Sequence, residues 1–461
     1  MIIPQNIFRE YDIRGIAETE LAPEFCVALG KAYGTYIQHI SGSKKVLVGH
    51  DNRLSSERIN QNIVEGLAAT GCEVLDLGLT LSPIAYFARV KLGIDGLVMI
   101  TASHNPKEFN GFKLAHNHGT IFGEEIQKIR TMIEAQDFIS GSGKVENYDI
   151  FPEYLSMLKE KIQLKLPLKI VVDCGNGTAS TFAQKILAEF GIAIIPLNCD
   201  SNGNFPKHNP DPVKIANLKE LLEKVKTENA VLGIGIDGDG DRLGVVDEKG
   251  NILWGDQLMS LFAREVLAKN PGAKIIVEVK SSQALLEDIA AHNGQPILWK
   301  TGHSLIEAKM KEEGALLAGE VSGHMYFADE YFGFDDALYA SLRLLRIVSQ
   351  SGKTLSELFA DIPKYFATPE IRIAVSDERK FVIVAEISAR LKEKYQVVDI
   401  DGARVLFPEG WALVRASNTQ PAIIIRAEGK TPEALEKIKQ EFGRYFLEYP
   451  EIHLDWEEQG V

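Results

Sequence analysis

Three stretches of this chain repeat one pattern: a basic residue, a short apolar run, a polar turn and a helix-like segment. The apolar runs cover residues 45–50, 168–172 and 274–279. Each run is short and ends in polar or glycine residues, which is typical of a buried strand. Strands that alternate with helices favour a parallel or mixed sheet covered by helices. The pattern therefore predicts three α/β units, related as a weak repeat of the fold and not of a site.

The segment after residue 363 follows a different pattern. It contains predicted strands at 371–375, 396–400, 402–407, 410–415 and 421–427, and predicted helices at 379–395 and 432–446. This arrangement indicates an α+β layer, with helices on an antiparallel sheet. A chain of 461 residues is also too long for one hydrophobic core. We therefore predict α/β domains at 1–147, 148–250 and 251–363, and an α+β domain at 364–461.

Composition narrows the class of protein. A net charge of −14 argues against non-specific nucleic-acid binding. The four cysteines are scattered without C-x-x-C spacing, which argues for reduced thiols in the cytoplasm and against a zinc site. Apolar runs stay well short of the roughly 20 residues that a membrane-spanning helix needs, and the first residues lack the pattern of a signal peptide. We expect a cytoplasmic protein with neither membrane nor nucleic-acid partners.

The hexapeptide Thr101-Ala102-Ser103-His104-Asn105-Pro106 follows an apolar run, 96–100, that is typical of a buried strand. Pro106 prevents an immediate helix. Ser103 is therefore expected in a loop past the carboxyl end of a strand, where open α/β sheets bind their ligands. Lys113 follows closely and adds positive charge. Taken alone, the hexapeptide fits a simple Ser/Asn turn slightly better.

The segment Asp237-Gly238-Asp239-Gly240-Asp241-Arg242 carries the strongest local signal. Alternate carboxylates on an extended loop can point to one side, and the glycines let the backbone fold around an ion. Three such close carboxylates repel one another unless a cation lies among them. The sixth position is Arg242, where an EF-hand loop needs glycine. Oxygen-only ligands therefore predict Mg²⁺, completed by a substrate phosphate.

Two further loops carry polar sets that suit a phosphorylated sugar. Loop 319–324 combines a carboxylate, a hydroxyl and an imidazole, which can bind sugar hydroxyls. Loop 415–421 combines a guanidinium, hydroxyls and an amide, which can hold a phosphate. Each loop alone fits a surface turn about equally well. Arg14, Lys280 and His303, each beside a predicted strand or loop, are read alone as structural or exposed residues.

Together, the motifs at 11–15, 101–106, 237–242, 319–324 and 415–421 resemble the α-D-phosphohexomutase superfamily in order and spacing. The Tyr-Asp-Ile-Arg-Gly opening and the Gly-Glu-x-Ser-Gly-His loop are closest to its bacterial phosphomannomutase/phosphoglucomutase branch. The glucosamine-specific branch usually carries glutamine where this chain has Val321, which makes glucosamine phosphate a less favoured substrate without excluding it.

The resemblance implies four domains around a central cleft, the last one similar to the TATA-box-binding protein. It implies a phosphoserine at Ser103, which passes its phosphate to a hexose phosphate and forms a bisphosphohexose intermediate. That intermediate turns over in the cleft and returns its other phosphate to Ser103. The phosphate thereby moves between carbons 1 and 6 of glucose or mannose. The substrates that it implies are small sugar phosphates, whereas the sequence leaves the oligomeric state, monomer or homodimer, open.

The resemblance also assigns roles to individual residues. One Mg²⁺ is held by Ser103, Asp237, Asp239 and Asp241. The catalytic residues are Ser103, Arg14, Lys113, Arg242 and His303, with His303 a candidate acid or base. The substrate-binding residues are Tyr11, Lys280, Glu320, Ser322, His324, Arg415, Ser417, Asn418 and Thr419.

Three alternatives stay open. A phosphoglucosamine mutase would use the same machinery on another sugar. A non-catalytic sugar-phosphate-binding protein of the same fold would not need Ser103 or three carboxylates. A serine hydrolase is disfavoured because the chain has no G-x-S-x-G motif, and because His104, adjacent to Ser103, is expected to be badly placed as its base.

Overall fold

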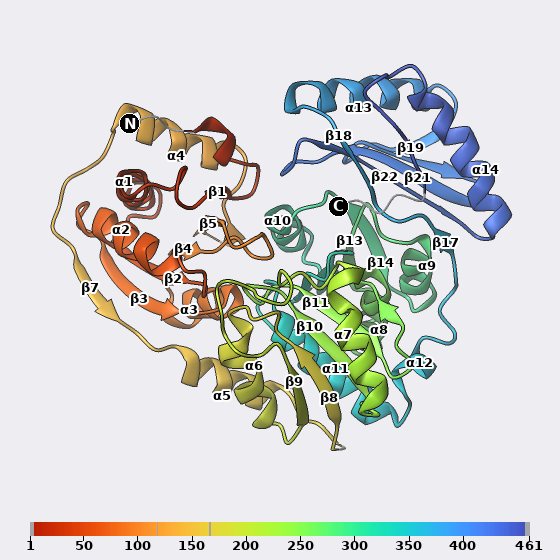
Figure 1. Cartoon of the computed structure of the whole chain (residues 1–461), viewed down its shortest axis with the longest axis horizontal. Helices are drawn as coiled ribbons and strands as arrows, with labels where there is room; N and C mark the ends of the chain where they lie inside the picture. The colour runs from red at the N-terminus through yellow and green to blue at the C-terminus, as the bar shows by residue number, and fades with distance from the viewer. Residues whose placement is uncertain (1–3, 118, 166, 457–461) are drawn as a thin grey trace.

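The computed structural model describes residues 4–117, 119–165 and 167–456, and it contains four β-sheets with helices packed on them (Figure 1). The four units follow one another along the chain, from the red and orange N-terminal unit to the blue C-terminal one. The prediction of an α/β protein with a final α+β unit is confirmed. Within these residues, no helix is long and apolar enough to cross a membrane.

The first sheet has the order β1-β5-β4-β2-β3-β7, with β6 beside β5. Its strands are β1 (Ile13–Ile16), β2 (Lys45–His50), β3 (Glu73–Leu79), β4 (Gly96–Ile100), β5 (Phe109–His116), β6 (Gly119–Thr120) and β7 (Lys144–Asn147). Its helices are α1 (Pro23–Ser41), α2 (Ser56–Ala68), α3 (Ser82–Leu92) and α4 (Glu124–Ala135), after a 3₁₀ turn at Gln5–Ile7. Strands β4, β2, β3 and β7 pair in parallel, whereas β1 and β5 join antiparallel.

Two expectations for this unit were wrong. The pair Arg14-Gly15 is typical of a loop by residue type, but it lies in β1, paired with β5. The glycine- and serine-rich sequence of residues 139–143 predicts a linker, yet Gly141 and Gly143 donate backbone hydrogen bonds to the carbonyls of Ala69 and Ala68 at the end of α2. Local glycine and serine content predicted flexibility because it carries no information about such tertiary partners.

The second and third sheets are also mixed, with the orders β12-β11-β10-β8-β9 and β14-β13-β15-β16. The second unit contains β8 (Lys169–Asp173), β9 (Ala193–Leu197), β10 (Leu232–Ile236), β11 (Leu243–Asp247) and β12 (Ile252–Leu253), with α5 (Phe151–Lys161), α6 (Ala179–Ala188) and α7 (Ile215–Thr227). The third contains β13 (Lys274–Glu278), β14 (Gln295–Trp299), β15 (Leu317–Gly319) and β16 (Met325–Phe327), with α8 (Gly255–Lys269), α9 (Gln283–Ala291), α10 (His303–Glu313), α11 (Ala337–Ser351) and α12 (Leu355–Leu358).

The fourth sheet is antiparallel throughout, in the order β17-β22-β21-β20-β19 with β18 beside β22. Its elements are β17 (Phe366–Ala367), β18 (Ile371–Ala374), α13 (Asp377–Lys392), β19 (Gln396–Val398), β20 (Ala403–Phe407), β21 (Gly410–Ala416), β22 (Ala422–Gly429), α14 (Pro432–Gly443) and a 3₁₀ turn at Arg444–Phe446. Figure 1 shows α13 and α14 together on one face of this sheet.

The hydrophobic cores explain how the units are joined. One buried cluster runs from α3 of the first unit through the second and third sheets to α11. The fourth unit has its own cluster between its sheet and α13 and α14. Because burial of apolar surface is the main stabilising contribution, the first three units are packed as one body. The fourth unit contacts the third through a small buried apolar cluster that includes Val279 and Trp411, and through the polar groups described below.

Candidate active site

Ser103 lies in the loop after β4, as the sequence predicts, and its residue is 3% exposed. Its backbone has a positive φ of 49°, a left-handed conformation that non-glycine residues adopt only when neighbours hold them there. Its Oγ donates to Asp237 Oδ2 at 2.7 Å. The Nδ1 atom of His104 lies 3.0 Å from the same Oγ. The expectation that His104 is badly placed was therefore wrong, because the left-handed turn brings adjacent side chains together.

The acidic loop connects β10 to β11 and folds around the side chain of Asp237. Asp237 Oδ1 accepts backbone hydrogen bonds from Gly240, Asp241 and Arg242 at 3.0, 3.0 and 3.1 Å. Gly238 packs directly on the serine loop, the connection of residues 101–108 between β4 and β5. A Cβ atom at Gly238 would come within 2.2 Å of the Ser103 carbonyl oxygen. The glycine is therefore required for close contact between the two loops.

Lys113, on β5, inserts its ammonium group into the acidic cluster. Its Nζ lies 2.7 Å from Asp239 Oδ2, 2.5 Å from Asp241 Oδ2 and 3.4 Å from Ser82 Oγ. Burial would lower the pKa of Lys113, but the two carboxylates raise it well above its usual range. Burial would likewise raise the pKa of Asp241, yet Lys113 and other cations hold it well below its usual range. One cation of the protein thus already lies among the carboxylates.

The acidic cluster retains capacity for a metal ion. Asp237, Asp239 and Asp241 each offer an oxygen, and these atoms lie within 4.8 Å of one another. The second oxygens of Asp239 and Asp241 are buried without a hydrogen-bond partner among the described residues. Burial and the neighbouring carboxylates raise the pKa of Asp237 well above its usual range, which shows that this site gains from added positive charge. Oxygen ligands of this kind fit a hard divalent cation such as Mg²⁺.

Arg242 connects the acidic loop to the 319–324 loop. Its Nε donates to His324 Nε2 at 3.0 Å, and His324 Nδ1 lies 2.7 Å from Asp335 Oδ2. The aspartate fixes the histidine ring so that Nε2 faces the arginine. A second arginine, Arg14, bonds to Asp12 at 2.5 Å and to Asn105 Oδ1 at 2.9 Å. A guanidinium group therefore lies directly beside Asn105 in the loop that carries Ser103.

The 319–324 loop is a tight turn between β15 and β16. Glu320 Oε1 accepts from the backbone N–H of Gly302 at 3.1 Å, and Oε2 accepts from Ser322 Oγ at 2.9 Å. Burial and the nearby Glu278 raise the pKa of Glu320. The carboxylate, hydroxyl and imidazole of this loop thus lie close together, beside the acidic cluster.

His303 is the first residue of α10, and its buried Nε2 has no partner among the described residues. Its ring lies 6.1 Å from the rings of Tyr11 and of His324. Burial lowers the pKa of His303 well below its usual range, and the charge of Lys113 adds to that effect. Because both effects disfavour the protonated ring, the imidazole favours its neutral form, in which a ring nitrogen can accept a proton as a general base requires.

The 415–421 loop reaches across to the first and third units. Arg415 Nε donates to Asp401 Oδ2 at 2.9 Å, and that oxygen also accepts from the Thr301 backbone at 3.1 Å. Asn418 Nδ2 donates to the Tyr11 hydroxyl at 2.5 Å, which in turn donates to the Thr301 carbonyl at 2.7 Å. These polar contacts fasten the fourth unit over the site.

Two other predicted residues complete this part of the site. Ser417 Oγ accepts from the backbone N–H of Thr419 at 3.4 Å, which keeps the 415–421 loop compact. Lys280 lies 3.0 Å from Glu278 and 2.8 Å from Glu370, so acidic neighbours hold its ammonium group in place. The structure thus brings every sequence-predicted site residue to one region where the four units meet.

Sequence reasoning missed the residues that hold this set in place. They are Arg53, Ser82, Glu278, Asp335, Glu370 and Asp401. Asp51-Asn52-Arg53 follows a predicted strand, so its polar character was a usable signal of the kind that selected Ser103. The others become recognisable only through their partners, which lie on distant segments.

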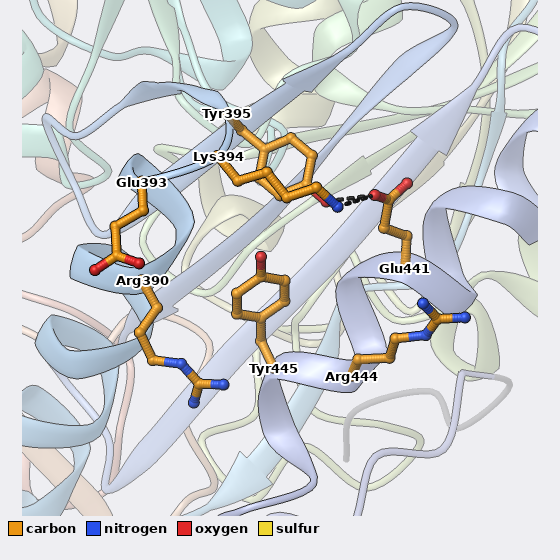
Figure 2. Close-up of a pocket in the computed structure, with 7 residues that line it drawn as sticks. All are labelled: Arg390, Glu393, Lys394, Tyr395, Glu441, Arg444 and Tyr445. Carbon is orange, nitrogen blue, oxygen red and sulfur yellow. Dashed lines mark hydrogen bonds and ion pairs between the residues drawn. The ribbon is translucent and has the colours of Figure 1, made fainter.

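A separate pocket lies within the fourth unit (Figure 2). It has a volume of about 370 Å³ and is lined by Arg390, Glu393, Lys394, Tyr395, Glu441, Arg444 and Tyr445. Lys394 is paired with Glu441 at 2.8 Å, and Arg390 with Glu448 at 2.9 Å, so these charges are already compensated within the protein. The pocket includes none of the predicted site residues.

Four family models match consecutive parts of the chain. They describe the phosphoglucomutase/phosphomannomutase α/β/α domains I, II and III, at residues 5–140, 152–250 and 254–366, and the C-terminal domain, at residues 370–444. The chain belongs to the phosphoglucomutase/phosphomannomutase family. This confirms the resemblance on which the sequence analysis relied.

Individual relatives agree with the family assignment. The phosphomannomutase/phosphoglucomutase of Pseudomonas aeruginosa PAO1 is 45% identical over 441 residues, which cover 95% of each chain. A phosphoglucomutase of Neisseria meningitidis serogroup A is 40% identical, over 95% of this chain and 96% of the relative. A crystal structure of a family protein from Burkholderia thailandensis has a TM-score of 0.92 and 39% identity, over 96% of this chain and 98% of that one. The prediction of a phosphohexomutase enzyme is thereby confirmed.

A more distant neighbour shares the fold alone. The Aspergillus fumigatus N-acetylphosphoglucosamine mutase, described as a complex with GlcNAc-6P and magnesium, has a TM-score of 0.63 and 14% identity, over 97% of this chain and 96% of that one.

Proposed function

We propose that this enzyme interconverts hexose 1-phosphate and hexose 6-phosphate, of glucose and of mannose, through a phosphoserine at Ser103. The observation that carries the proposal is the placement of Ser103 Oγ, which lies 2.7 Å from Asp237 in the acidic loop. The left-handed backbone at Ser103 supports a functional role, since such strain is concentrated at active sites.

In the first half-reaction, the free sugar hydroxyl attacks the phosphorus of phosphoserine 103. A bond forms between that sugar oxygen and phosphorus, and the bond from phosphorus to Ser103 Oγ breaks. The product is a bisphosphohexose; the proton of the attacking hydroxyl passes to a base, and Ser103 Oγ takes up a proton as it leaves. In the second half-reaction, Ser103 Oγ loses that proton and attacks the other phosphate of the turned intermediate. The bond between Oγ and phosphorus forms, the bond from that phosphorus to the sugar oxygen breaks, and the sugar oxygen takes up the proton. This step regenerates the phosphoserine and releases the isomeric monophosphate.

Charged side chains stabilise the transferring phosphate in this scheme. Ser103, Asp237, Asp239 and Asp241 would hold Mg²⁺, which supplies Lewis-acid stabilisation of the phosphoryl charge. Lys113 compensates carboxylate charge at the same place. Arg14 and Arg242 would bind the transferring phosphoryl group and fix its orientation.

The remaining residues bind the sugar and move the proton. His303 accepts the hydroxyl proton, a role supported by its neutral imidazole and unpartnered Nε2. Glu320 and Ser322 bind the sugar's ring hydroxyls, with His324 and Lys280 beside them. The non-reacting phosphate is held by Arg415, Ser417, Asn418 and Thr419. Tyr11 lies next to this set, because its hydroxyl accepts from Asn418. One phosphate cradle then serves both orientations of the intermediate, and the fourth unit excludes water that would hydrolyse the phosphoserine.

Further parts of the proposal concern organisation. We place the enzyme in the cytoplasm as a monomer or homodimer, with domain boundaries after residues 147 and 363. The boundary expected after residue 250 moves to the end of β12, because that strand pairs with β11 of the second sheet. Bisphosphohexose is the intermediate and, added in trace amounts, the activator that phosphorylates Ser103.

The test is mutase turnover with Mg²⁺ and a trace of hexose bisphosphate, on glucose 1-phosphate, mannose 1-phosphate and glucosamine 1-phosphate side by side. Comparable turnover of the first two substrates is expected. Turnover of glucosamine 1-phosphate alone would assign the chain to the glucosamine branch. No turnover of any of them by folded protein would contradict the proposal and favour a binding role.

A further inference from the structure

Arg53 lies directly behind the Ser103 loop. It belongs to the connection between β2 and α2, and its side chain is 0% exposed. Its Nε donates to Asp51 Oδ2 at 3.0 Å. Its remaining N–H groups donate to four backbone carbonyls, three in the serine loop and one at the start of β5: Ser103 at 2.8 Å, Asn105 at 2.7 Å, Pro106 at 2.7 Å and Phe109 at 3.0 Å. All five donors of the guanidinium are therefore used.

Only a planar guanidinium can serve four carbonyls in this way. Arginine offers five N–H donors in a fixed fork, whereas lysine offers three from a single nitrogen. The carbonyls come from a segment that is not helical and has few other backbone bonds: Asn105 donates to Ala102, Phe109 donates to Pro106, and Ala17 donates to Glu108. Arg53 is thus the main group that holds this loop in its shape.

The hydrogen bond from Arg53 to the Ser103 carbonyl matters because the Ser103 backbone is in an unfavourable conformation. The left-handed φ of 49° persists in a non-glycine residue only where neighbours enforce it. The Ser103 N–H donates to Thr101 Oγ1 at 2.8 Å. The Ser103 carbonyl lies between Arg53 on one side and the backbone of Gly238 on the other. These contacts fix the orientation of the Ser103 peptide groups. Because the side chain is attached to that backbone, they also restrict the direction in which Oγ points.

Residues 51–53, the segment that contains Arg53, also connect the serine loop to the second unit. The backbone N–H of Asn52 donates to Thr178 Oγ1 at 2.9 Å, and its Nδ2 donates to the Asn176 carbonyl at 2.8 Å. Thr178 in turn donates to the carbonyl of Gly238, in the acidic loop, at 3.0 Å. Residues 51–53 thus link the loop that carries Ser103 to the loop that carries the three aspartates.

We propose that Arg53 is a positioning residue for phosphoryl transfer, which holds Ser103 in its left-handed conformation so that Oγ stays aligned with the acidic loop. It acts through the backbone and not by contact with the phosphate. The inference rests on the proposed function, because alignment has a consequence only if Ser103 carries the transferred phosphate.

The test compares Arg53→Lys with wild type. A misplacement of about 1 Å costs on the order of 10²-fold in rate, so we expect kcat to fall by about that factor with KM little changed. The phosphoserine, exposed to water in a looser loop, should also hydrolyse faster, which intact-mass spectrometry over time measures directly. A merely structural residue would not change the phosphoserine lifetime in protein that melts at the wild-type temperature.

Arg58→Lys is the matched control. Arg58 also donates to backbone carbonyls, those of Ala17 at 3.2 Å and Leu21 at 3.4 Å, but on a different loop. It should leave kcat and the phosphoserine lifetime at wild-type values. If Arg53→Lys does not fold, Asp51→Asn, which weakens the Nε anchor and keeps the arginine, should shift both quantities in the same direction.

A folded Arg53→Lys protein with wild-type kcat and phosphoserine lifetime overturns the proposal, as does an unchanged Asp51→Asn protein if the lysine variant is unfolded. Wild type is assayed first. Wild-type protein without turnover or phosphoserine contradicts the proposed function itself, so the two failures are distinguishable.

Discussion

Ser103 Oγ and Asp237 Oδ2 are 2.7 Å apart, although 134 residues separate them in the sequence. Ser103 follows a strand of the first sheet, and Asp237 follows a strand of the second. The contact requires both loops to be tightly folded, one by a left-handed serine and the other by three backbone bonds to Asp237 Oδ1. This pairing of a hydroxyl with a carboxylate cluster is the basis of the predictions that follow.

Replacement of the proposed nucleophile tests the phosphoserine. Ser103→Ala removes the oxygen that accepts the phosphate, so mutase activity should fall by at least ~10³-fold. The phosphoryl mass increment should disappear from the intact protein after incubation with hexose bisphosphate. Ser388→Ala is a suitable control, because that hydroxyl bonds only to Val384 of its own helix at 2.6 Å. Near-wild-type turnover by Ser103→Ala would falsify the assignment.

The acidic loop is tested by its metal dependence. Asp239→Asn removes one negative charge and leaves a weaker, neutral oxygen ligand, and a bound metal supplies several kcal/mol of transition-state stabilisation. We expect kcat to fall by about 10²-fold or more, and the Mg²⁺ concentration for half-maximal activity to rise. Asp399→Asn, at an exposed position paired with Lys392, should titrate like wild type. An Asp239→Asn protein with the wild-type Mg²⁺ curve would remove this residue from the metal site.

The phosphate cradle is tested by Arg415→Ala. A hydrogen bond to a charged group contributes about 1.5–3 kcal/mol, so KM should rise about 10- to 100-fold, with a smaller effect on kcat. Steady-state kinetics with hexose 1-phosphate measures both constants. Arg379→Ala, which loses only an exposed pair with Glu451, should keep the wild-type KM. The cradle is rejected if KM does not move in a folded Arg415→Ala protein.

The lowered pKa of His303 leads us to expect that the stability of the folded protein depends on pH. The pKa of this residue is lowered well below the usual value of about 6.5, chiefly by burial. Below about pH 6.5 the unfolded chain therefore binds a proton that the folded state does not, so the free energy of unfolding decreases as the pH is lowered. Above about pH 6.5 the stabilising contribution of the neutral His303 is fully present. At pH 5.5 this residue should cost up to about 1.4 kcal/mol.

The measurement is the thermal unfolding midpoint at pH 7.5 and pH 5.5. His303→Asn should lose less stability than wild type between these values, and it should also lose activity if the histidine transfers the proton. His39→Asn, at an exposed position of α1, should keep the wild-type difference. Equal pH dependence in wild type and His303→Asn would show that the imidazole titrates normally.

Much of the site was predictable because four of the five motifs, all except 11–15, lie at the end of a strand. Polar residues at the carboxyl ends of strands, such as Ser103 after β4 and Asp237 after β10, meet at sheet edges. The prediction failed where a residue's role depends on a distant partner. Arg14 was expected in a loop because nothing local reveals its pairing with β5. His104 was dismissed because sequence adjacency does not reveal the left-handed turn that brings it to Ser103.

The sequence by itself determined the strand and helix pattern, the order of the motifs and the chemistry that each can perform, since these depend on local periodicity and residue type. Only the tertiary structure decided that Lys113 lies inside the carboxylate cluster, that Asp335 fixes His324, and that Arg53 holds the serine loop. The physical reason is that burial and hydrogen bonding act through space. A charge is compensated, or a backbone strain is held, by whichever group the fold brings within bonding distance.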